Sequence, residues 1–520
     1  MGTGKPRKLK FVHLLIALLL GVLLGIILTP SPRSQSAESI TDKLNEVIQL
    51  VDKEYVDEID CDTLSNTLLN AMMLALDPHS HYLPLDELRK EQESIQGNFD
   101  GIGVVLHYLG DTVYVSEVMS NGPSARSGLQ PGDLIWCVDG DTVSGVGLSN
   151  EETVGHIRGP HGTRVTLTVQ RHGEKKPLRF TIVRGRVVTP SIAYIGMMPR
   201  HTGYINLNRF SETTGDEMRL ALQQLRQQGM QRLVLDLRGN GGGLLEAAIA
   251  VADELLEDGD MIVYTEGAHQ RRYNILSTHG GLFEQGELVV LIDEYSASAS
   301  EIVAGAVQDN DRGTIYGRRS FGKGLVQRQF DLSYGSALWL TTARYYTPSG
   351  RCIQRPYSHG SDDYYMRFLE RLATVPTTAD SSYLTQPLDD STQYFTKQKR
   401  VVYGGGGICP DKMLPYRVDN GAADFNRLVN SGKPSRKAFA YIIRHVVELQ
   451  HEYPSEALFM ERFQFPDLDK QLPEATQLQP AQHQRLEQLM KAYVAQSLFG
   501  QQAFYRIYIT IDDDLGRIEN

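Results

Sequence analysis

The sequence predicts a multidomain α/β protein. Its 520 residues exceed one ordinary domain, and a content of 41% hydrophobic and 22% charged residues is typical of globular chains. Short strand patterns dominate residues 97–186, whereas strands and helices alternate over 187–414, which predicts a mainly parallel sheet covered by helices. Helical patterns at 37–96 and 415–520 flank these two regions, and residues 1–36 hold a basic and then an apolar segment.

The N-terminal segment predicts one membrane anchor. Residues 11–28 form a run of 18 residues without Asp, Glu, Lys or Arg. This length is short for a membrane-spanning helix but long for a cleavable signal core, and residues 29–37 offer only a weak cleavage site, so we favour an uncleaved anchor over a removed signal peptide. Basic residues before the run should stay in the cytoplasm, which places the remaining chain in the periplasm or another extracytoplasmic space; they are Lys5, Arg7, Lys8 and Lys10.

Charge and cysteine content argue against a nucleic-acid partner and against a zinc site. The formal net charge of −11 argues against a nucleic-acid surface, which is normally basic. The four cysteines are widely spread and form no Cys-x-x-Cys pair, so we expect no zinc site; they are Cys61, Cys137, Cys352 and Cys409. Asp77, His79 and His81 resemble a metal-ligand cluster, but a capped loop that ends a helix before Pro78 is the better interpretation. We therefore expect no metal.

A strand-to-helix turn at 293–301 is the candidate catalytic centre. Residues 288–292 form an unbroken apolar run, typical of a strand buried on both faces, and residues 299–308 have helical spacing. Such a turn presents its residues at the sheet edge, beside backbone N–H groups at a positive helix end. A serine there is a nucleophile when a base lies within reach, and Lys323, flanked by glycines, is the candidate base. The turn lacks the Gly-x-Ser-x-Gly elbow of common hydrolases.

Two motifs resemble those of the carboxy-terminal processing (tail-specific) proteases: Ser-Ala-Ser-Ala-Ser-Glu at 296–301 and Gly-Lys-Gly at 322–324. That family uses a Ser–Lys dyad on a ClpP/crotonase-like fold. Lys323 follows Ser298 by 25 residues, the spacing of the family, which selects Ser298 over the serines two positions away. The family's glutamine corresponds to Gln327, which the resemblance implies orients the lysine.

The glycine-rich loop 236–243 has two interpretations. A strand, a Gly-rich turn and a helix also begin a nucleotide-binding loop, but the full Gly-x-Gly-x-x-Gly and the P-loop Gly-Lys-Ser are missing. The resemblance implies instead that the N–H of a glycine, by alignment Gly242, forms half of an oxyanion hole. The other half is then the N–H of Ala299. The neighbouring position Gly241 leaves the choice among these glycines open by one residue.

Three charged residues near the predicted centre receive structural interpretations. Asp236 and Arg238 are expected to brace the glycine loop. Glu301 is a favourable residue for the first turn of the helix after Ser298, because acidic groups stabilise helix N-termini, and it is given no catalytic role.

Residues 97–186 resemble a PDZ domain. Strands are predicted at 101–106, 112–116, 133–138, 164–169 and 179–183, with short helices at 122–128 and 150–158. A PDZ domain adds an extended peptide to a sheet edge and captures its terminal carboxylate with backbone N–H groups. The resemblance implies a carboxylate loop that begins at Asp100 and contains Gly101, Ile102 and Gly103, with Val104 in the side-chain pocket. A plain β module without a ligand is the alternative.

These observations predict a membrane-anchored serine endopeptidase that binds the C-terminal tails of protein substrates and cleaves them through an acyl-enzyme, without a cofactor. The alternative is a non-catalytic, membrane-anchored PDZ scaffold that binds protein C-termini. Polar residues at about 356–400 indicate an inserted surface segment. The role of 415–520, a partner such as an adaptor, and the oligomeric state are left open.

Overall fold

The computed structural model describes residues 32–278, 280–374, 392–416 and 421–518, and their side chains from residue 39 onward. It divides into two compact units, and the boundary between them along the chain falls between Ala71 and Met72. In the described part of the chain, no helix is both long enough and apolar enough to span a membrane. The anchor predicted at 11–28 lies outside the described residues.

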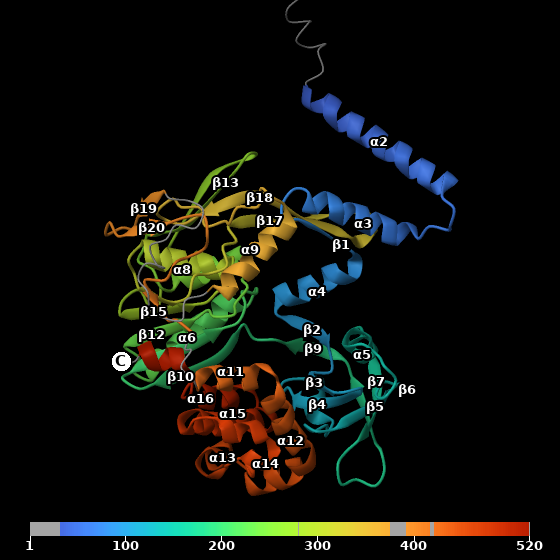
Figure 1. The fold of residues 1–520 in the computed structure, drawn as a ribbon, viewed down its shortest axis with the longest axis vertical. Coiled ribbons are helices and arrows are strands. Elements are labelled where there is room, and N and C mark those ends of the chain that lie inside the picture. Colours follow the sequence, from blue (N-terminus) through green and yellow to red (C-terminus); the bar gives the residue numbers. More distant parts are fainter. Residues whose placement is uncertain (1–31, 279, 375–391, 417–420, 519–520) are drawn as a thin grey trace, which may run out of the picture. The chain divides into compact units, whose positions relative to one another are not determined.

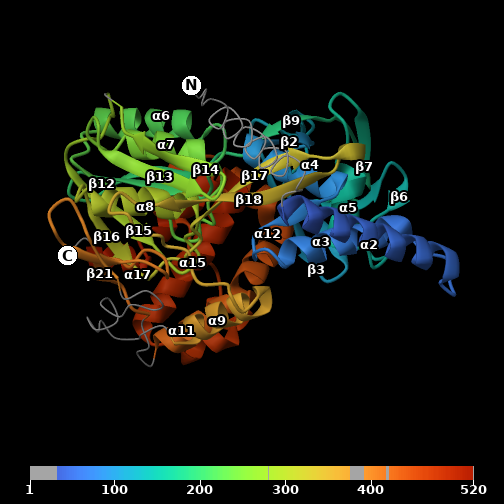
Figure 2. The ribbon, with the colours of Figure 1, turned by 90° about the horizontal axis from the view of Figure 1, so that it is seen from above.

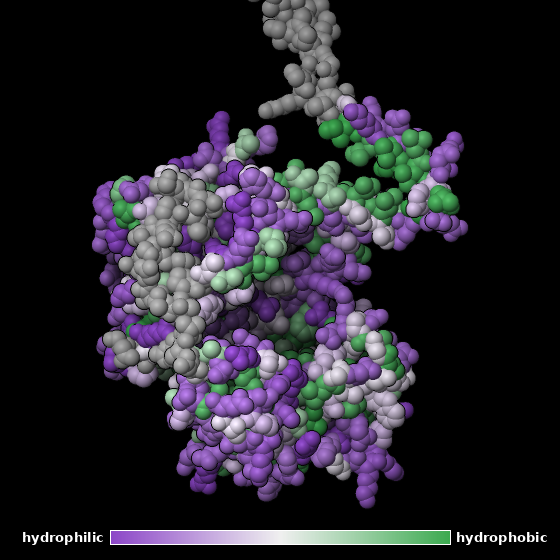
Figure 3. Space-filling view, viewed as in Figure 1, coloured by the Kyte–Doolittle hydropathy of each residue, from purple (hydrophilic) through white to green (hydrophobic). Residues whose placement is uncertain are grey.

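The first unit contains the helix α2 (Pro32–Glu54) and most of α3 (Cys61–Leu74). Several apolar side chains of α2 are about half exposed, and hydrophobic residues are visible along this helix in Figure 3; they are Ile40, Leu44, Val47, Ile48 and Leu50. The predicted helical region is therefore present, with an apolar stripe that faces solvent in the isolated chain.

The strand-rich module of the second unit is a sheet in the order β3-β4-β5-β7-β8, with β6 paired to β5 (Figure 1). Its elements are β3 (Val104–Leu109), β4 (Thr112–Val118), η1 (Pro123–Arg126), β5 (Leu134–Val138), β6 (Asp141–Thr142), α5 (Asn150–Ile157), β7 (Arg164–Gln170) and β8 (Leu178–Val183). Alternate residues of β7 (Val165, Leu167 and Val169) are fully buried, as the period of a strand with one core face requires.

One predicted strand of this module is wrong in its extent. The segment 101–106 was expected to be continuous, but β2 (Asn98–Gly101) ends at Gly101 and pairs with β9 (Gly185–Val188), and β3 begins only at Val104. Gly103 has a φ of +74°, and a Cβ there would lie 2.7 Å from the Cα of Gly122. The chain therefore turns where the apolar pattern alone runs on, because only glycine fits this position.

The central sheet of the second unit has the order β10-β11-β12-β15-β16-β21. The pairs from β11 to β21 are parallel and β10–β11 is antiparallel, so the prediction of a mainly parallel sheet is confirmed. The strands are β10 (Ile192–Met198), β11 (Thr202–Leu207), β12 (Arg232–Asp236), β15 (Glu287–Ile292), β16 (Thr314–Gly317) and β21 (Lys412–Met413).

A second sheet contains β13, although β13 lies within the region 187–414, whose strands were predicted to form one mainly parallel sheet. It pairs antiparallel with β14 and β18, and β17 and β1 complete the sheet. A short apolar run indicates that a strand is buried but does not identify the strand beside it, so the sequence did not predict the second sheet. The strands are β1 (His81–Leu83), β13 (Met261–Gly267), β14 (Gln270–Leu276), β17 (Leu325–Asp331) and β18 (Ala337–Tyr346), with η2 (Ser333–Gly335) before β18.

Both faces of the central sheet are buried, by different parts of the chain. One face packs against α6 (Thr214–Gln227), α7 (Leu245–Asp253) and α8 (Ala299–Asp309). The other face, which includes Tyr204, Val234 and Leu291, packs against Leu515 and Ile518 near the C-terminus. Figure 2 shows α6 and α7 on one side of these strands and α17 (Asp513–Ile518) on the other. The C-terminal helices thus complete the core of the sheet.

The C-terminal extension is helical, as predicted, and has a core of its own. Phe439 of α12 lies 4.4 Å from the His107 ring of β3, and the backbone of Ile443 closely approaches Gly132 of the strand-rich module. The helices are α11 (Ala422–Asn430), α12 (Lys433–Glu452), α13 (Glu456–Arg462), α14 (Leu468–Gln471), η3 (Pro473–Gln477), α15 (Pro480–Phe499), α16 (Gln501–Tyr508) and α17. The extension therefore contacts both the strand-rich module and the central sheet.

Two further pieces bear on the site. The helix α4 (Leu85–Gln96) follows β1, and α9 (Ser361–Ala373) lies within the predicted polar insert. Tyr364 and Phe368 of α9 are buried against Phe321. This part of the insert is thus packed structure; β19 (Gln393–Phe395) and β20 (Val401–Tyr403) form a hairpin at its end.

Candidate active site

Ser298 occupies the strand-to-helix turn between β15 and α8. Its φ of +54° and ψ of −112° are unusual for a residue with a side chain, and such strain is characteristic of functional turns. Ser296 and Ser300 are fully buried, and their hydroxyls donate to the carbonyl oxygens of Leu237 and Asn240, each at 2.8 Å. Ser298 is partly exposed. Of the three serines, it is the one whose side chain a substrate can reach.

Glu301 joins the serine turn to the lysine loop. Its Oε2 accepts the backbone N–H of Ser298 at 2.8 Å and that of Lys323 at 2.9 Å. Its Oε1 accepts the N–H of Gly322 at 2.7 Å and the hydroxyl of Ser320 at 2.5 Å. The carboxylate is fully buried, and this burial raises the pKa of Glu301 although the four hydrogen bonds oppose the shift. Sequence reasoning assigned this residue only a helix-end role.

Lys323 lies in the loop between β16 and β17 and is mostly buried. Burial lowers the pKa of its amine, against the opposing charges of Glu301 and Asp77. The hydroxyl of Tyr345 contacts the carbonyl oxygens of both Lys323 and Ser298, the latter at 3.1 Å. No hydrogen bond joins the Ser298 hydroxyl to the Lys323 amine in the described part of the chain. The backbones of Ser298 and Lys323 are held together through their shared acceptor, Oε2 of Glu301.

Gln327 lies on β17 at a bulge between Val326 and Gln327. Its Nε2 donates to Oγ1 of Thr341 at 3.3 Å. The hydroxyl of Ser80 lies 3.3 Å from the same Oγ1 and accepts the backbone N–H of Thr341 at 3.0 Å. Ser80 in turn donates to Asp77 at 2.6 Å. The amide of Gln327 is therefore oriented by a chain of polar side chains that begins in the loop before β1.

That loop, 77–81, was interpreted as a cap, and its side chains bond to protein groups. His79 Nε2 lies 3.1 Å from the hydroxyl of Tyr364 on α9, and His81 Nδ1 lies 2.8 Å from the carbonyl oxygen of His79. Burial, followed by the charge of Lys323, lowers the pKa of His79 to about 3, so its ring is neutral at pH 7. The motif that resembled metal ligands instead lies against the lysine loop.

The glycine loop lies directly against the serine turn. A Cβ on Gly242 would fall 2.8 Å from the Cβ of Ser298 and 3.0 Å from the backbone nitrogen of Ala299, and its φ is +103°. Only glycine permits this approach. In this state the N–H of Gly242 donates to Oδ1 of Asn240 at 2.9 Å. The two residues predicted as oxyanion donors, Gly242 and Ala299, thus lie side by side, and the N–H of Gly242 has an acceptor within its own loop.

Arg238 braces the same loop, as the sequence predicted. Its guanidinium forms a two-pronged ion pair with Asp236, with contacts of 2.6 to 3.1 Å. It also pairs with Asp512 and Asp514 of the C-terminal extension, which sequence reasoning did not connect to the site. No local pattern identifies partners so distant in the chain.

The predicted peptide-binding residues form a turn and an edge strand. The carbonyl oxygens of Ile102 and Gly103 accept the N–H groups of Ser124 at 2.8 Å and Met119 at 3.0 Å, which fixes the turn. After it, Val104 begins β3, which lies at the edge of its sheet. The hydroxyl of Tyr108 on β3 reaches the N-terminal end of α5. An edge strand beside a helix is the geometry to which an extended peptide can add.

Comparisons with known proteins agree with this architecture. Peptidase family S41 matches residues 201–359 and the PDZ domain matches residues 114–171. The chain is 38% identical over 317 residues to the carboxy-terminal-processing protease of Bartonella bacilliformis (strain ATCC 35685 / KC583 / Herrer 020/F12,63), which covers 60% of this chain and 72% of that protein. It is 30% identical over 401 residues to a probable CtpA-like serine protease of Staphylococcus aureus (strain COL), with 76% and 77% covered.

Among solved structures, the photosystem II D1 C-terminal processing protease is 29% identical, with a TM-score of 0.34 over 59% of this chain and 82% of that chain. The first relative is similar enough, over enough of its length, to establish the family. The chain therefore belongs to the carboxy-terminal-processing proteases of peptidase family S41 and is a serine-type peptidase with a PDZ domain.

Proposed function

We propose that Ser298 is the nucleophile and Lys323 the general base of this peptidase. The observation that carries the proposal is the single carboxylate oxygen of Glu301 that accepts the backbone N–H groups of both residues. A lysine acts as a base only when neutral, and the burial that lowers its pKa favours that form. Gln327 is proposed to orient the amine in the substrate complex.

The proposed reaction proceeds in two steps. Neutral Lys323 takes the hydroxyl proton as Ser298 Oγ attacks the scissile carbonyl carbon, and the N–H groups of Ala299 and Gly242 stabilise the oxyanion. The protonated lysine returns its proton to the leaving amine, and an acyl-enzyme forms. Lys323 then takes a proton from water as the water attacks the ester carbonyl, and returns it to Ser298 Oγ as the bond to the acyl group breaks. For Gly242 to donate, the oxyanion must replace the side chain of Asn240 as its acceptor.

The dyad is tested with Ser298→Ala and Lys323→Ala. Matched controls are Ser333→Ala and Lys412→Ala, because both side chains are exposed. Each protein, as residues 37–520, is incubated with an unfolded protein that ends in small apolar residues, and the products are weighed by mass spectrometry. We expect cleavage by the parent and the controls and none by the dyad variants. Cleavage retained in Ser298→Ala would remove the assignment. Binding of the tail without cleavage by the parent would favour the scaffold alternative.

We also propose that substrate C-termini dock on the PDZ domain, with the carboxylate at the turn of Gly101, Ile102 and Gly103 and the peptide along β3 beside Val104. The fixed turn and the edge strand support this placement. Peptides with a free C-terminal carboxylate should bind at least tenfold more tightly than their C-terminal amides, as measured by fluorescence anisotropy. Equal affinities would place the docking elsewhere.

Residues 11–28 are proposed to anchor the chain in the cytoplasmic membrane, with the peptidase on the extracytoplasmic side. The apolar run and its basic flank support this proposal. In membrane fractions the full chain should resist carbonate extraction and be digested by protease added from the extracytoplasmic side, whereas residues 37–520 should be soluble. Release of the full chain by carbonate would contradict the anchor.

A further inference from the structure

Three loops at the carboxyl ends of neighbouring strands build the peptidase site, and each carries a buried charge. Arg238 follows β12 and precedes Gly242 by four residues, Glu294 follows β15 and precedes Ser298 by four, and Arg318 follows β16 and precedes Lys323 by five. Arg318 Nε donates to both oxygens of Glu294, at 3.0 and 3.1 Å. Arg318 and Glu294 have 7% and 1% of their side-chain surface exposed, so this pair is shielded from water.

The C-terminal segment 512–514 connects these loops. Oδ2 of Asp514 lies 3.2 Å from a terminal nitrogen of Arg238 and 3.2 Å from one of Arg318. Both oxygens of Asp512 accept from Arg238, at 3.0 and 3.2 Å. One carboxylate oxygen thus joins an arginine of the glycine loop to an arginine of the lysine loop, and through Arg318 to the serine turn.

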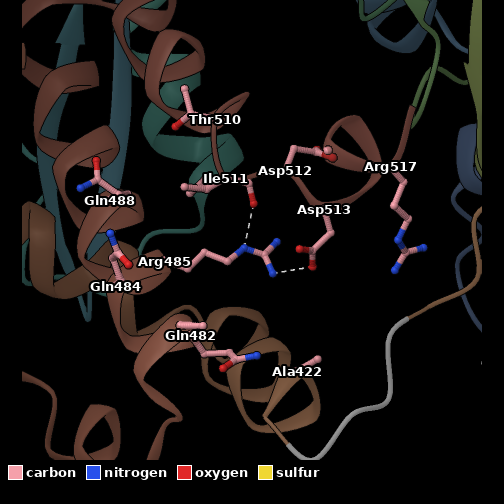
Figure 4. Close-up of a pocket in the computed structure, with 12 residues that line it drawn as sticks. Ala422, Gln482, Gln484, Arg485, Gln488, Thr510, Ile511, Asp512, Asp513 and Arg517 are labelled. Atoms are coloured by element: carbon pink, nitrogen blue, oxygen red, sulfur yellow. Dashed lines mark hydrogen bonds and ion pairs between the residues drawn. The ribbon is translucent and has the colours of Figure 1, made fainter. Parts of the chain in front are cut away.

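The segment is itself firmly docked. Arg485 of α15 donates to the carbonyl oxygen of Ile511 at 2.8 Å and to Asp513 at 2.6 Å, at the edge of a pocket of about 650 Å³ (Figure 4). Oδ1 of Asp512 accepts the N–H groups of residues 514 and 515, which caps α17. Leu515 is buried against the central sheet. Because α17 is fixed to the sheet, its acidic residues occupy defined positions.

Charge neutralisation alone does not explain these contacts. Arg238 already pairs with Asp236 at the end of β12, and Arg318 already pairs with Glu294 of the neighbouring loop. Two buried guanidinium groups repel each other at short range, and a shared carboxylate holds them at a fixed separation. Such two-pronged and shared arginine contacts define geometry more strongly than single hydrogen bonds. The extra carboxylates therefore fix where the two loops lie relative to each other.

We propose that Asp512 and Asp514 are positioning residues of the peptidase: they hold the loops of Arg238 and Arg318 so that Gly242 and Lys323 are correctly placed relative to Ser298. The proposal rests on the dyad function above. It predicts that loss of the two carboxylates lowers the rate of the chemical steps and leaves tail binding unchanged, because the PDZ turn and β3 do not contact this segment in the contacts described.

The test uses the full chain with Asp512→Asn together with Asp514→Asn, and with Asp514→Asn alone. The amides keep the shape of the carboxylates and remove their charge. Asp424→Asn is the matched control, since Asp424 forms an exposed pair with Arg427 in the same extension. Two rates are measured: labelling of Ser298 by a fluorophosphonate, and kcat and KM for an unfolded protein with an apolar C-terminal tail. The melting temperature of each protein is recorded beside them.

We expect the double variant to lose at least tenfold in labelling rate and in kcat, and Asp514→Asn alone at least threefold. KM, the Kd of a tail peptide and the melting temperature of the single variant should stay close to those of the parent, as should all values of Asp424→Asn. If the double variant does not fold, the single variant, which keeps the Asp512 cap, decides. If either the double variant or Asp514→Asn folds and is labelled and turns over substrate at the rates of the parent, the proposal is wrong.

The same experiment separates this inference from the dyad assignment. Labelling that persists in Ser298→Ala would mean that the proposed nucleophile is wrong. Labelling that is lost in Ser298→Ala but unchanged in Asp514→Asn and in the double variant would leave the dyad in place and remove only the positioning role of Asp512 and Asp514.

Discussion

Glu301 and Asp512 are both buried carboxylates beside the peptidase site, but their partners differ. Glu301 accepts three backbone N–H groups and one hydroxyl and forms no ion pair among the described residues. Asp512 pairs with the guanidinium of Arg238. Burial raises the pKa of Glu301, whereas for Asp512 burial is outweighed by Arg238 and the pKa is lowered. Inside the site the carboxylate is held by neutral donors alone, whereas Asp512 has a cation in addition to two backbone N–H groups.

This difference matters for the lysine. A fixed arginine beside Glu301 would place a second positive charge close to Lys323. Neutral donors hold the two loops without adding a charge to the site. The attraction between Glu301 and Lys323 acts to raise the pKa of the lysine and so opposes its proposed role as a base. Burial of the amine is the larger effect, so the pKa of Lys323 is lowered, at a cost in stability.

The largest expected effect follows from replacing the base. Lys323→Met fills a similar volume without a charge, so cleavage should fall by about a thousandfold while the melting temperature stays equal or rises. Lys323→Met should be the more stable protein because a lysine whose pKa is lowered on folding destabilises the native state at neutral pH. Each unit by which folding lowers a pKa corresponds to about 1.4 kcal/mol. Thermal unfolding of Lys323→Met and of the exposed control Lys412→Met measures this stabilisation. A clear drop in the first alone would show that Lys323 is charged and stabilised by Glu301.

Glu301→Gln should have the next largest effect. An amide –NH₂ must replace one of the two carboxylate oxygens, each of which accepts two hydrogen bonds, so donors would face donors. We expect kcat to fall by about a hundredfold, because the serine turn and the lysine loop separate, and stability to fall by about 3 kcal/mol. Steady-state kinetics and urea unfolding measure both, with the exposed Glu212→Gln as control. Unchanged kcat would mean that the shared acceptor is not what aligns the dyad.

A smaller effect concerns the free energy of unfolding, whose pH dependence should have opposite signs for the two carboxylates. Asp512 has a lowered pKa, so its contribution to stability is fully present above its unfolded value of about 3.9 and is lost as the pH falls through the folded value. Glu301 has a raised pKa, so the folded state loses stability as the pH rises from about 4.5 through the folded value. Unfolding free energies from pH 2 to 7 for the parent, Asp512→Asn and Glu301→Gln should show these opposite trends. Trends of equal sign would contradict the comparison.

Activity itself should respond to pH through the lysine. Only the neutral amine accepts the Ser298 proton, so kcat/KM should increase as the pH rises through the lowered pKa of Lys323 and reach a plateau below pH 10.5. The profile of the free enzyme is measured with a short peptide ester. A rate that increases up to the ordinary pKa of lysine would show that the amine is not desolvated.

Sequence patterns predicted the strands, the helices and the turn that carries Ser298, because burial, spacing and glycine positions are local properties. They did not predict that β13 joins the second sheet or that α9 lies in the insert against Phe321. The contacts of Glu301 depend on a loop about twenty residues downstream, and those of Arg238 depend on Asp512 and Asp514 more than 270 residues away. A single sequence has no periodic signal for such contacts; paired acidic and basic changes among relatives are the signal that would identify them.

The long separation between Ser298 and Asp514 has a consequence for biosynthesis. The proposed nucleophile Ser298 and the proposed base Lys323 are made 214 and 189 residues before Asp512, where the acidic segment that we propose aligns their loops begins. A growing chain therefore carries both reactive side chains through much of its synthesis without that support. The order of translation would keep an unfinished protease inefficient while other unfolded chains are close by, and would bring full activity only once the chain is long enough to fold back on its own central sheet.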